Sequence, residues 1–392
     1  MTLFPPTQPT PAEIKLRRRV QAVGPITFAE FMETALYDPG LGYYVSGDVF
    51  GPRGDFYTAP MTHPAFGALI AAQLAQVWRA LGSPFPFWVI EPAAGNGRLA
   101  ADIRASLAGR DPVFVGALRY VTLDVAAPSA GVRSAGLPLH VPNGVVLANE
   151  LLDAMPVHRL TVVDGELREL RVGLDDEGDA GAFIDVASEP TPGLTERLRA
   201  VGAELSEGQV AEVNLGLDTW MAEAAAAIDT GYVMLIDYGH EAPDYYDASR
   251  SRGTLRCYYR HTMNMSPYQH VGRQDISVHV ELTSLRRAAA GAGLTEVGNT
   301  SQAAFLRGLG FDSLRAVAPS GDRAALDTLV DPEGMGGFRV LAFGKGAKVT
   351  ELSGFGGPAI MWEGEAPRST LGHLPPGGEQ EPDMPTWEEL LR

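Results

Sequence analysis

Residues 91–97 (EPAAGNG) are the segment whose composition most clearly suits ligand binding. They follow an apolar run at 87–90 that is typical of a buried parallel strand, and they precede an expected helix reaching about Leu107. Gly95 and Gly97 lack side chains, so the backbone there can come within contact distance of a ligand. The start of the helix also offers free N–H groups to a polar moiety. The turn is therefore a candidate site for a nucleotide-type cofactor.

Two cofactors fit this turn. Read as G-x-G-x-x-A from Gly95 to Ala100, it satisfies the fingerprint for a dinucleotide such as NAD. Read as E-x-A-x-G-x-G, with Glu91 and Ala93 ahead of both glycines, it matches the first motif of class I methyltransferases, which bind S-adenosylmethionine. A carboxylate at position 91 would repel a pyrophosphate and attract an ammonium group, which favours S-adenosylmethionine. Asp124 ends the next expected strand, where an acid can accept both hydroxyls of a ribose.

A second group of polar residues follows the expected strand at 144–149, in the run Asn149-Glu150-Leu-Leu-Asp153. Ligands of open parallel sheets bind beyond the carboxyl ends of the strands, so these residues would stand where a methyl group is transferred. A carboxylate there can hold the planar fork of an arginine guanidinium and aim one nitrogen at the methyl. Glu150 is the first candidate for this catalytic role and Asp153 the second. Alternatively, the two acids begin a helix and are favoured by its dipole.

His279 is a further candidate catalytic residue, because it follows Asp275 by four positions in a segment rich in Tyr, Arg and His. It could line the acceptor pocket, and a hydrogen-bonded structural role fits it equally well. No Cys/His pair has zinc-like spacing and no HExxH sequence occurs, so no metal site is expected.

The chain of 392 residues has a formal net charge of −17 and a pI near 4.9. This charge argues against a nucleic-acid backbone as the main partner and would suit a cationic substrate. The sequence contains neither a long apolar run nor an apolar stretch after a basic N-terminus, so neither a membrane span nor a secretory signal is expected. A single cysteine, Cys257, excludes an internal disulfide and fits a reducing compartment, with the cytoplasm as the default.

The elements that would position these residues alternate between strand and helix, which predicts an α/β fold with a doubly wound, Rossmann-like parallel sheet. Asp164-Gly165 predicts a hairpin within an antiparallel insertion. The expected division is an N-terminal helical and loop segment that could act as a lid (1–62), a core (63–156 and 229–347), an insertion of hairpin and helices (157–228), a loop covering the acceptor site (241–280) and a loose C-terminal tail (348–392).

An ordered series of motifs along residues 14–345 resembles the MidA family of class I methyltransferases. The series includes GPITFAEFMETALYDPGLGYY (24–44), GDFYT (54–58), the 91–97 turn, NELLDAMPVH (149–158), IDYGH (236–240), GTLRCYYRH (253–261), DISVHVELTSL (275–285), QAAFLRGLG (302–310) and MGGFRVLAFG (335–344). The resemblance implies a class I fold, S-adenosyl-L-methionine as cofactor and methylation of an arginine of a partner protein. For a eukaryotic member it implies the mitochondrial matrix. The residues that it assigns to cofactor contact are Gly54, Thr58, Glu91, Ala93, Gly95, Gly97, Asp124 and Asn149.

The sequence departs from the family pattern at three places, one of which is the segment HVGRQD (270–275), where relatives commonly carry a D-P-G-type turn. Ala93 stands where the family's E-x-G-P-G-x-G has its first glycine, which is tolerable if the backbone there keeps a negative φ. Ala59 and Met61 replace a serine and an acid of the family's G-D-F-x-T-S-P-E segment. These losses leave open a small-molecule or other non-arginine acceptor. A third alternative is a binding protein with a vestigial cofactor site, and the intact Gly95, Gly97 and Asp124 argue against it. A homodimer is one option for the oligomeric state.

Overall fold

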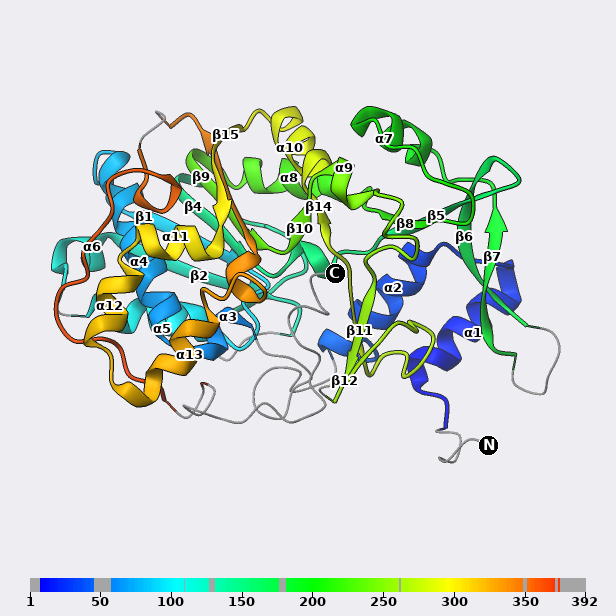
Figure 1. Ribbon diagram of the computed structural model, residues 1–392, viewed down its shortest axis with the longest axis horizontal. Coiled ribbons are helices and arrows are strands. Elements are labelled where there is room, and N and C mark those ends of the chain that lie inside the picture. The colour runs from blue at the N-terminus through cyan, green and yellow to red at the C-terminus, as the bar shows by residue number, and fades with distance from the viewer. Residues whose placement is uncertain are drawn as a thin grey trace. The chain divides into compact units, whose positions relative to one another are not determined.

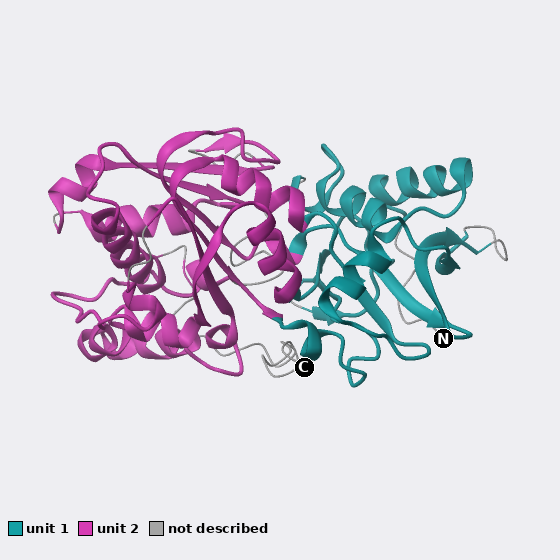
Figure 2. Ribbon diagram, turned by 90° about the horizontal axis from the view of Figure 1, so that it is seen from above, with its two compact units in different colours: residues 1–49, 154–216, 240–281 teal, residues 50–153, 217–239, 282–392 magenta. Residues whose placement is uncertain are grey.

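The structure, a computed structural model, describes residues 8–45, 58–108, 110–126, 131–175, 181–260, 262–347, 351–370 and 373. The chain forms two compact units, which Figure 2 colours separately. Unit 1 comprises Met1–Val49, Ala154–Gly216 and His240–Glu281, and unit 2 comprises Phe50–Asp153, Leu217–Gly239 and Leu282–Arg392. Within the described ranges, no helix combines the length and apolar character that crossing a membrane requires.

Unit 2 is built on a seven-stranded sheet with the order β15-β16-β9-β4-β1-β2-β3 (Figure 1). Its strands are β1 (Phe87–Pro92), β2 (Leu118–Asp124), β3 (Val132–Arg133), β4 (Val141–Asn149), β9 (Ile228–Asp237), β15 (Thr295–Ser301) and β16 (Arg339–Lys345). Strands β9, β4, β1, β2 and β3 pair in parallel, whereas β16 is antiparallel to both β9 and β15. The chain runs outward in both directions from β1 and β4, so the predicted doubly wound sheet is confirmed.

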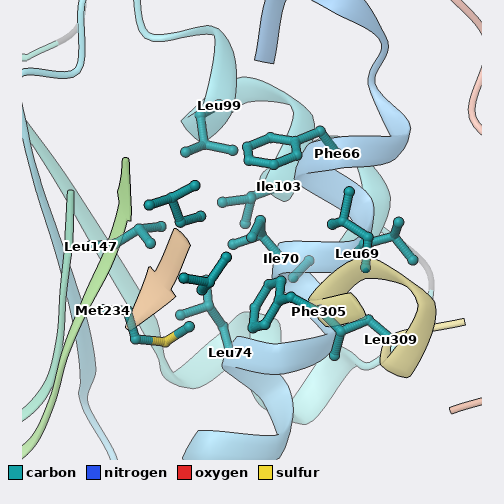
Figure 3. Packing of buried hydrophobic residues seen from close by; sticks show 14 of the residues in the cluster. Phe66, Leu69, Ile70, Leu74, Leu99, Ile103, Leu147, Met234, Phe305 and Leu309 are labelled. Atoms are coloured by element: carbon teal, nitrogen blue, oxygen red, sulfur yellow. The ribbon is translucent and has the colours of Figure 1, made fainter. Parts of the chain in front are cut away.

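Apolar helices and the sheet enclose the main core of unit 2 (Figure 3). Helix α4 (Ala65–Ala80) is apolar on almost every face, which is typical of a helix that is covered all round. Its Phe66 and Ile70 are fully buried, as is Met234 of β9. A Cβ on Gly67 would lie 2.6 Å from the Cβ of Asp102, so this glycine lets α4 approach α5 (Arg98–Leu107) closely.

The remaining helical elements of unit 2 are short. They are α3 (Ala59–Thr62), α6 (Pro112–Ala117), α8 (Leu217–Ala226), α10 (Leu282–Gly291), α11 (Gln302–Gly308), α12 (Phe311–Val317) and α13 (Arg323–Thr328), with 3-10 turns at Ser320–Asp322, Met335–Gly337 and Ser353–Phe355. A further 3-10 turn, Leu152–Ala154, and the two-residue strand β10 (Gly239–His240) lie where the chain passes from one unit to the other.

Unit 1 combines helices with two small sheets. Threonine side chains cap α1 (Pro11–Val23) and α2 (Phe28–Tyr37), since Thr10 accepts from the Glu13 N–H and Thr27 from the Glu30 N–H. The antiparallel sheet β7-β6-β5-β8 consists of β5 (His158–Val163), β6 (Glu166–Leu174), β7 (Phe183–Ser188) and β8 (Val210–Val213). Asp164 and Gly165 both have positive φ between β5 and β6, so the predicted hairpin is confirmed.

The second sheet of unit 1 has the order β12-β11-β13. Its strands are β11 (Arg256–Tyr259), β12 (Thr262–Asn264) and β13 (Asp275–Ser277), and the unit also contains β14 (Val280–Glu281), α7 (Leu194–Val201), α9 (Ala242–Tyr245) and a 3-10 turn at Tyr43–Val45. Of the segment expected to act as a lid (1–62), residues 1–7 and 46–57 lie outside the described residues, and its role as a lid stays a prediction.

Residues 351–370 pack onto unit 2, which differs from the expectation of a loose tail. Leu352 is buried in the main core. The Ser353 N–H donates to Gln76 at 2.9 Å and the Gly354 N–H donates to Gln73 at 3.1 Å. Both glutamines project from α4, so the tail gains partners 277 and 281 positions away in sequence. A composition rich in Gly and Pro gives no sign of such long-range anchoring.

Candidate active site

The cofactor turn connects β1 to α5 through residues with positive φ. Ala93, Gly95 and Gly97 have φ values of 52°, 54° and 76°. The negative φ under which alanine would be tolerable at position 93 is not observed, and an L-residue in the left-handed region costs roughly 1–2 kcal/mol. A Cβ placed on Gly97 would meet no atom within 4 Å, so open space borders the turn where α5 begins. The backbone of the turn is therefore accessible to a ligand.

Glu91 ends β1 as a buried carboxyl group, 4% exposed. Its Oε2 accepts a hydrogen bond of 2.8 Å from the hydroxyl of Tyr120 on β2. Burial raises the pKa of Glu91 from its ordinary value to about 8, although the Tyr120 hydrogen bond and the charge of Arg104 act in the opposite direction. Tyr120 and Arg104 do not fully compensate for the hydration that this carboxylate loses on burial. A cation bound beside it would compensate for that loss.

Asp124 stands at the carboxyl end of β2, next to the cofactor turn. Its Oδ2 accepts from the Gly95 N–H at 2.9 Å and its Oδ1 accepts from the Ala126 N–H at 2.8 Å. These contacts fix the carboxylate against the turn, and burial raises its pKa above the ordinary value. Each carboxylate oxygen has a second lone pair, so the group can still accept hydroxyl donors.

Asn149 ends β4, the strand beside β1, and Glu150 follows it. Glu150 Oε1 accepts from the Asn149 side-chain amide at 3.0 Å and from the Ala59 N–H at 3.2 Å. Burial, and then the charge of Asp153, raise the pKa of Glu150 to about 8. The Asn149 Oδ1 is buried and accepts no hydrogen bond within the described part of the chain.

Asp153 lies in the 3-10 turn Leu152–Ala154, whereas Glu150 has φ +51° and stands outside any helix. The two acids therefore do not share a helical face, which removes the helix dipole as the reason for Glu150. The Tyr238 hydroxyl donates to Asp153 Oδ2 at 2.5 Å.

Asp237, at the end of β9, is a site residue that sequence reasoning missed. Its Oδ2 accepts from the Leu152 N–H at 2.9 Å and from the Asp153 N–H at 3.3 Å. Burial, with the charges of Asp153 and Glu150, holds its pKa well above the ordinary value. The signal was present, since Asp237 ends an apolar strand in the same way as Asp124. Tyr120, inside a strand, gave no such signal.

The other candidate residues are placed as follows. Thr58 precedes α3 and its carbonyl accepts from the Met61 N–H at 2.9 Å, while Gly54 lies outside the described residues. His279 belongs to unit 1, where it is 3% exposed and its ring stacks on His240 with centroids 5.0 Å apart. Its part in acceptor binding stays a prediction. Among residues with described positions, no group of three or more acidic, His or Cys side chains could hold a metal ion.

The carboxyl edge of the sheet in unit 2 thus gathers acids whose pKa values are raised by burial. Those with raised values are Glu91, Asp124, Glu150 and Asp237. Such an edge is suited to positively charged ligands. S-adenosylmethionine carries an ammonium group, a sulfonium and ribose hydroxyls. The buried acids, the unsatisfied Asn149 oxygen and the open glycine turn fit these groups, whereas a pyrophosphate would face repulsion.

Comparisons with known proteins agree with this chemistry. A family model described as "Putative S-adenosyl-L-methionine-dependent methyltransferase" matches residues 69–300. The mitochondrial protein arginine methyltransferase NDUFAF7 homolog of Drosophila melanogaster is 28% identical over 386 residues, 86% of this chain and 86% of the relative. Protein arginine methyltransferase NDUFAF7 of Danio rerio, also mitochondrial by name, is 27% identical over 82% of this chain and 83% of the relative.

A solved structure extends the likeness to a ligand-bound protein. The crystal structure of a Burkholderia thailandensis protein bound to S-adenosyl-homocysteine has 32% sequence identity and a TM-score of 0.80, covering 92% of this chain and 99% of that one. The prediction of S-adenosylmethionine rather than NAD is confirmed. Since the family match spans more than half of the 392 residues, the chain belongs to the S-adenosyl-L-methionine-dependent methyltransferase family.

Proposed function

We propose that this enzyme methylates an arginine side chain of a partner protein and that Glu150 holds the guanidinium. The observation that carries the proposal is the state of Glu150, a buried carboxyl group with a pKa near 8 beside two further acids, Asp153 and Asp237. A guanidinium is always charged and pairs with a carboxylate through two parallel hydrogen bonds. Bringing it to Glu150 replaces the hydration that burial has removed. A neutral acceptor would give the carboxyl group no reason to lose its proton.

The relatives support the same acceptor. The Drosophila and zebrafish proteins are both named protein arginine methyltransferases, and each alignment covers more than four fifths of either chain. Their names also place them in mitochondria, so the mitochondrial matrix is the compartment we propose if this chain is eukaryotic, and the cytoplasm if it is not. A homodimer stays a prediction.

On the cofactor side, the roles follow from charge and geometry. Glu91 would bind the ammonium group, while Ala93, Gly95 and Gly97 would bring their backbone against the methionine part. Asp124 would accept the ribose hydroxyls. Asn149 Oδ1 offers a further buried acceptor, and Thr58 and Gly54 are expected to contact the cofactor. When bound, S-adenosylmethionine supplies a methyl group activated by the adjacent sulfonium.

The chain's own task is then to orient the acceptor nitrogen. Methyl transfer needs an in-line approach of a lone pair, and the lone pairs of a guanidinium are delocalised. A carboxylate that grips two of its nitrogens draws positive charge toward itself and leaves the third free to approach the methyl. Glu150 is fixed for this by the Asn149 amide and the Ala59 N–H. Asp153, held by Tyr238, would add negative potential.

A second candidate is methyl transfer to a small-molecule or other non-arginine acceptor. It is favoured by the surroundings of Glu150, where Ala59 replaces a serine of the family pattern and contributes only its backbone N–H. Met61, in place of an acid, is buried. Helix α3, whose Ala59 N–H contacts Glu150, therefore lacks the hydroxyl and the carboxyl that the family pattern would supply.

Transfer of an isotopically labelled methyl group separates these candidates. The purified enzyme is incubated with labelled S-adenosylmethionine and an extract of its host, divided into a protein fraction and a small-molecule fraction. We expect label in the protein fraction, and peptide mass spectrometry should place it on arginine. Label confined to small molecules, or to another residue type, would reject the arginine acceptor and retain the methyltransferase.

A further inference from the structure

Residues 250–274 of unit 1 depart from the charge balance of the chain. The whole protein has 48 acidic and 31 basic residues, yet this basic segment contains five arginines and no aspartate or glutamate. The arginines are Arg250, Arg252, Arg256, Arg260 and Arg273. A local excess of positive charge on an otherwise acidic molecule creates a field that attracts anions to one place.

The structure places two of these arginines, Arg260 and Arg273, near one pair of stacked rings. Tyr259 ends β11 and stacks on His270 with centroids 4.0 Å apart and planes 13° from parallel. The Arg260 guanidinium carbon lies 5.2 Å from the centroid of the Tyr259 ring. Arg273 follows in the next turn, where its N–H donates to the His270 carbonyl at 2.7 Å. Both arginines are exposed.

The backbone that presents these groups is held in place. Val271 is fully buried, and its carbonyl accepts a hydrogen bond from the Thr10 hydroxyl. A Cβ on Gly272 would lie 2.7 Å from Ala12 and 2.9 Å from the Leu41 carbonyl, so the turn fits tightly against α1 and the residues that follow α2. Because the turn is already ordered, little backbone entropy would be lost when a ligand binds there.

Two acids that adjoin or contact the basic segment are engaged elsewhere. Asp275 is buried and accepts from the Tyr44 hydroxyl at 2.6 Å. Asp185 pairs with Arg159 at 2.7 Å and also accepts from the Tyr268 hydroxyl. Within the described residues, no acidic side chain forms an ion pair with Arg273. The charges of Arg260 and Arg273 add to burial in lowering the pKa of His270, so both guanidinium groups lie near its ring.

We propose that Arg260, Arg273 and the stacked Tyr259–His270 pair form a docking surface for an acidic segment of a partner polypeptide. Arginine forks match carboxylates in pairs, and the flat ring stack offers apolar area for the aliphatic stems of aspartate and glutamate. A nucleic acid fits less well, because its continuous backbone charge would meet the −17 net charge of the enzyme. This docking goes beyond the methylation chemistry and does not require that the bound segment contain the methylated residue.

The test uses the full chain and three fluorescent probes of about ten units each. One is a glycine peptide interspersed with glutamate, one is the same peptide with glutamine, and one is an oligothymidylate. Binding is followed by fluorescence anisotropy near physiological salt, without S-adenosylmethionine. The test variant combines Arg260→Asn with Arg273→Gln, since asparagine tolerates the positive φ of Arg260. The control combines Arg18→Gln with Arg199→Gln, two exposed arginines on α1 and α7 whose replacement changes the charge equally.

The wild type and the control should prefer the glutamate peptide, and the test variant should bind it about 2- to 30-fold more weakly, as expected for two exposed charge pairs. Equal affinity of the two variants would overturn the proposal, as would absent binding or a preference for the oligothymidylate. Unchanged affinity for S-adenosyl-homocysteine shows that each variant is folded. If the double variant does not fold, Arg273→Gln alone is compared with Arg199→Gln. Because no methyl transfer is measured, failure here leaves the arginine acceptor untouched.

Discussion

Replacing Glu91 with glutamine should change how stability depends on pH. In the folded chain Glu91 keeps its proton up to about pH 8, whereas in the unfolded chain it loses the proton near its ordinary 4.5. The folded state thus binds more protons between these values, and stability falls as pH rises through this window. The gap corresponds to about 5 kcal/mol at most. Screening by solvent reduces this free energy only slightly, because Glu91 is 4% exposed.

Urea unfolding of the cofactor-free protein between pH 5 and 9 measures this effect. The difference in unfolding free energy between Glu91→Gln and wild type should move in favour of the variant as pH rises, and it should level off above about pH 8. The raised pKa values of the other buried acids contribute to both proteins and cancel in the difference. Glu333→Gln, at an exposed glutamate, serves as the control and should show no such trend.

Calorimetry adds a ligand readout to the same variant. At pH 7 a group with a pKa of about 8 is roughly one-tenth ionised, so binding of a cation that needs the carboxylate should release close to one proton. Titrations of S-adenosylmethionine in two buffers of different ionisation enthalpy report that release, and Glu91→Gln should lose most of it. Parallel pH profiles of stability together with equal proton release in both proteins would refute the assigned state of Glu91.

Three further substitutions test the cofactor side. Gly95→Val should abolish binding of S-adenosyl-homocysteine in a protein that remains folded by circular dichroism, because a branched side chain strains a φ of 54° and blocks the turn; unchanged calorimetric affinity would remove the turn from the site. Asp124→Asn should weaken binding by about 1–3 kcal/mol, since an amide replaces one acceptor oxygen, and an affinity within twofold of wild type would exclude the ribose role. Tyr120→Phe removes a hydrogen bond that lowers the pKa of Glu91. The pH at which cofactor affinity rises should therefore move upward, and an unmoved profile would limit Tyr120 to packing.

Sequence patterns predicted the fold because they depend on local chemistry. The apolar strand before Glu91, the acid that ends the next strand and the Asp164-Gly165 turn each carry their signal within a few residues. The doubly wound sheet follows from their alternation with helices. The positive φ of Ala93 could not be read from the sequence, because an alanine gives no local sign of a left-handed backbone.

The partners of the site acids could not be predicted in this way. The Ala59 N–H reaches Glu150 across 91 positions of sequence, and the Tyr238 hydroxyl reaches Asp153 across 85. Raised pKa values result from burial, which depends on how whole elements pack. Asp237 could have been found by applying to β9 the rule that identified Asp124, that an acid ending a buried parallel strand faces the ligand edge.

The most direct test of the proposed function is Glu150→Gln with two readouts. Glutamine keeps the shape of the side chain and removes the charge that would orient a guanidinium, a contribution worth roughly 3–4 kcal/mol in the transition state. We expect S-adenosylmethionine affinity to stay within a few fold of wild type while methyl transfer to protein falls by two to three orders of magnitude, about what that energy implies. Full turnover would contradict a carboxylate-held acceptor, and lost cofactor affinity in a folded variant would place Glu150 on the cofactor side instead.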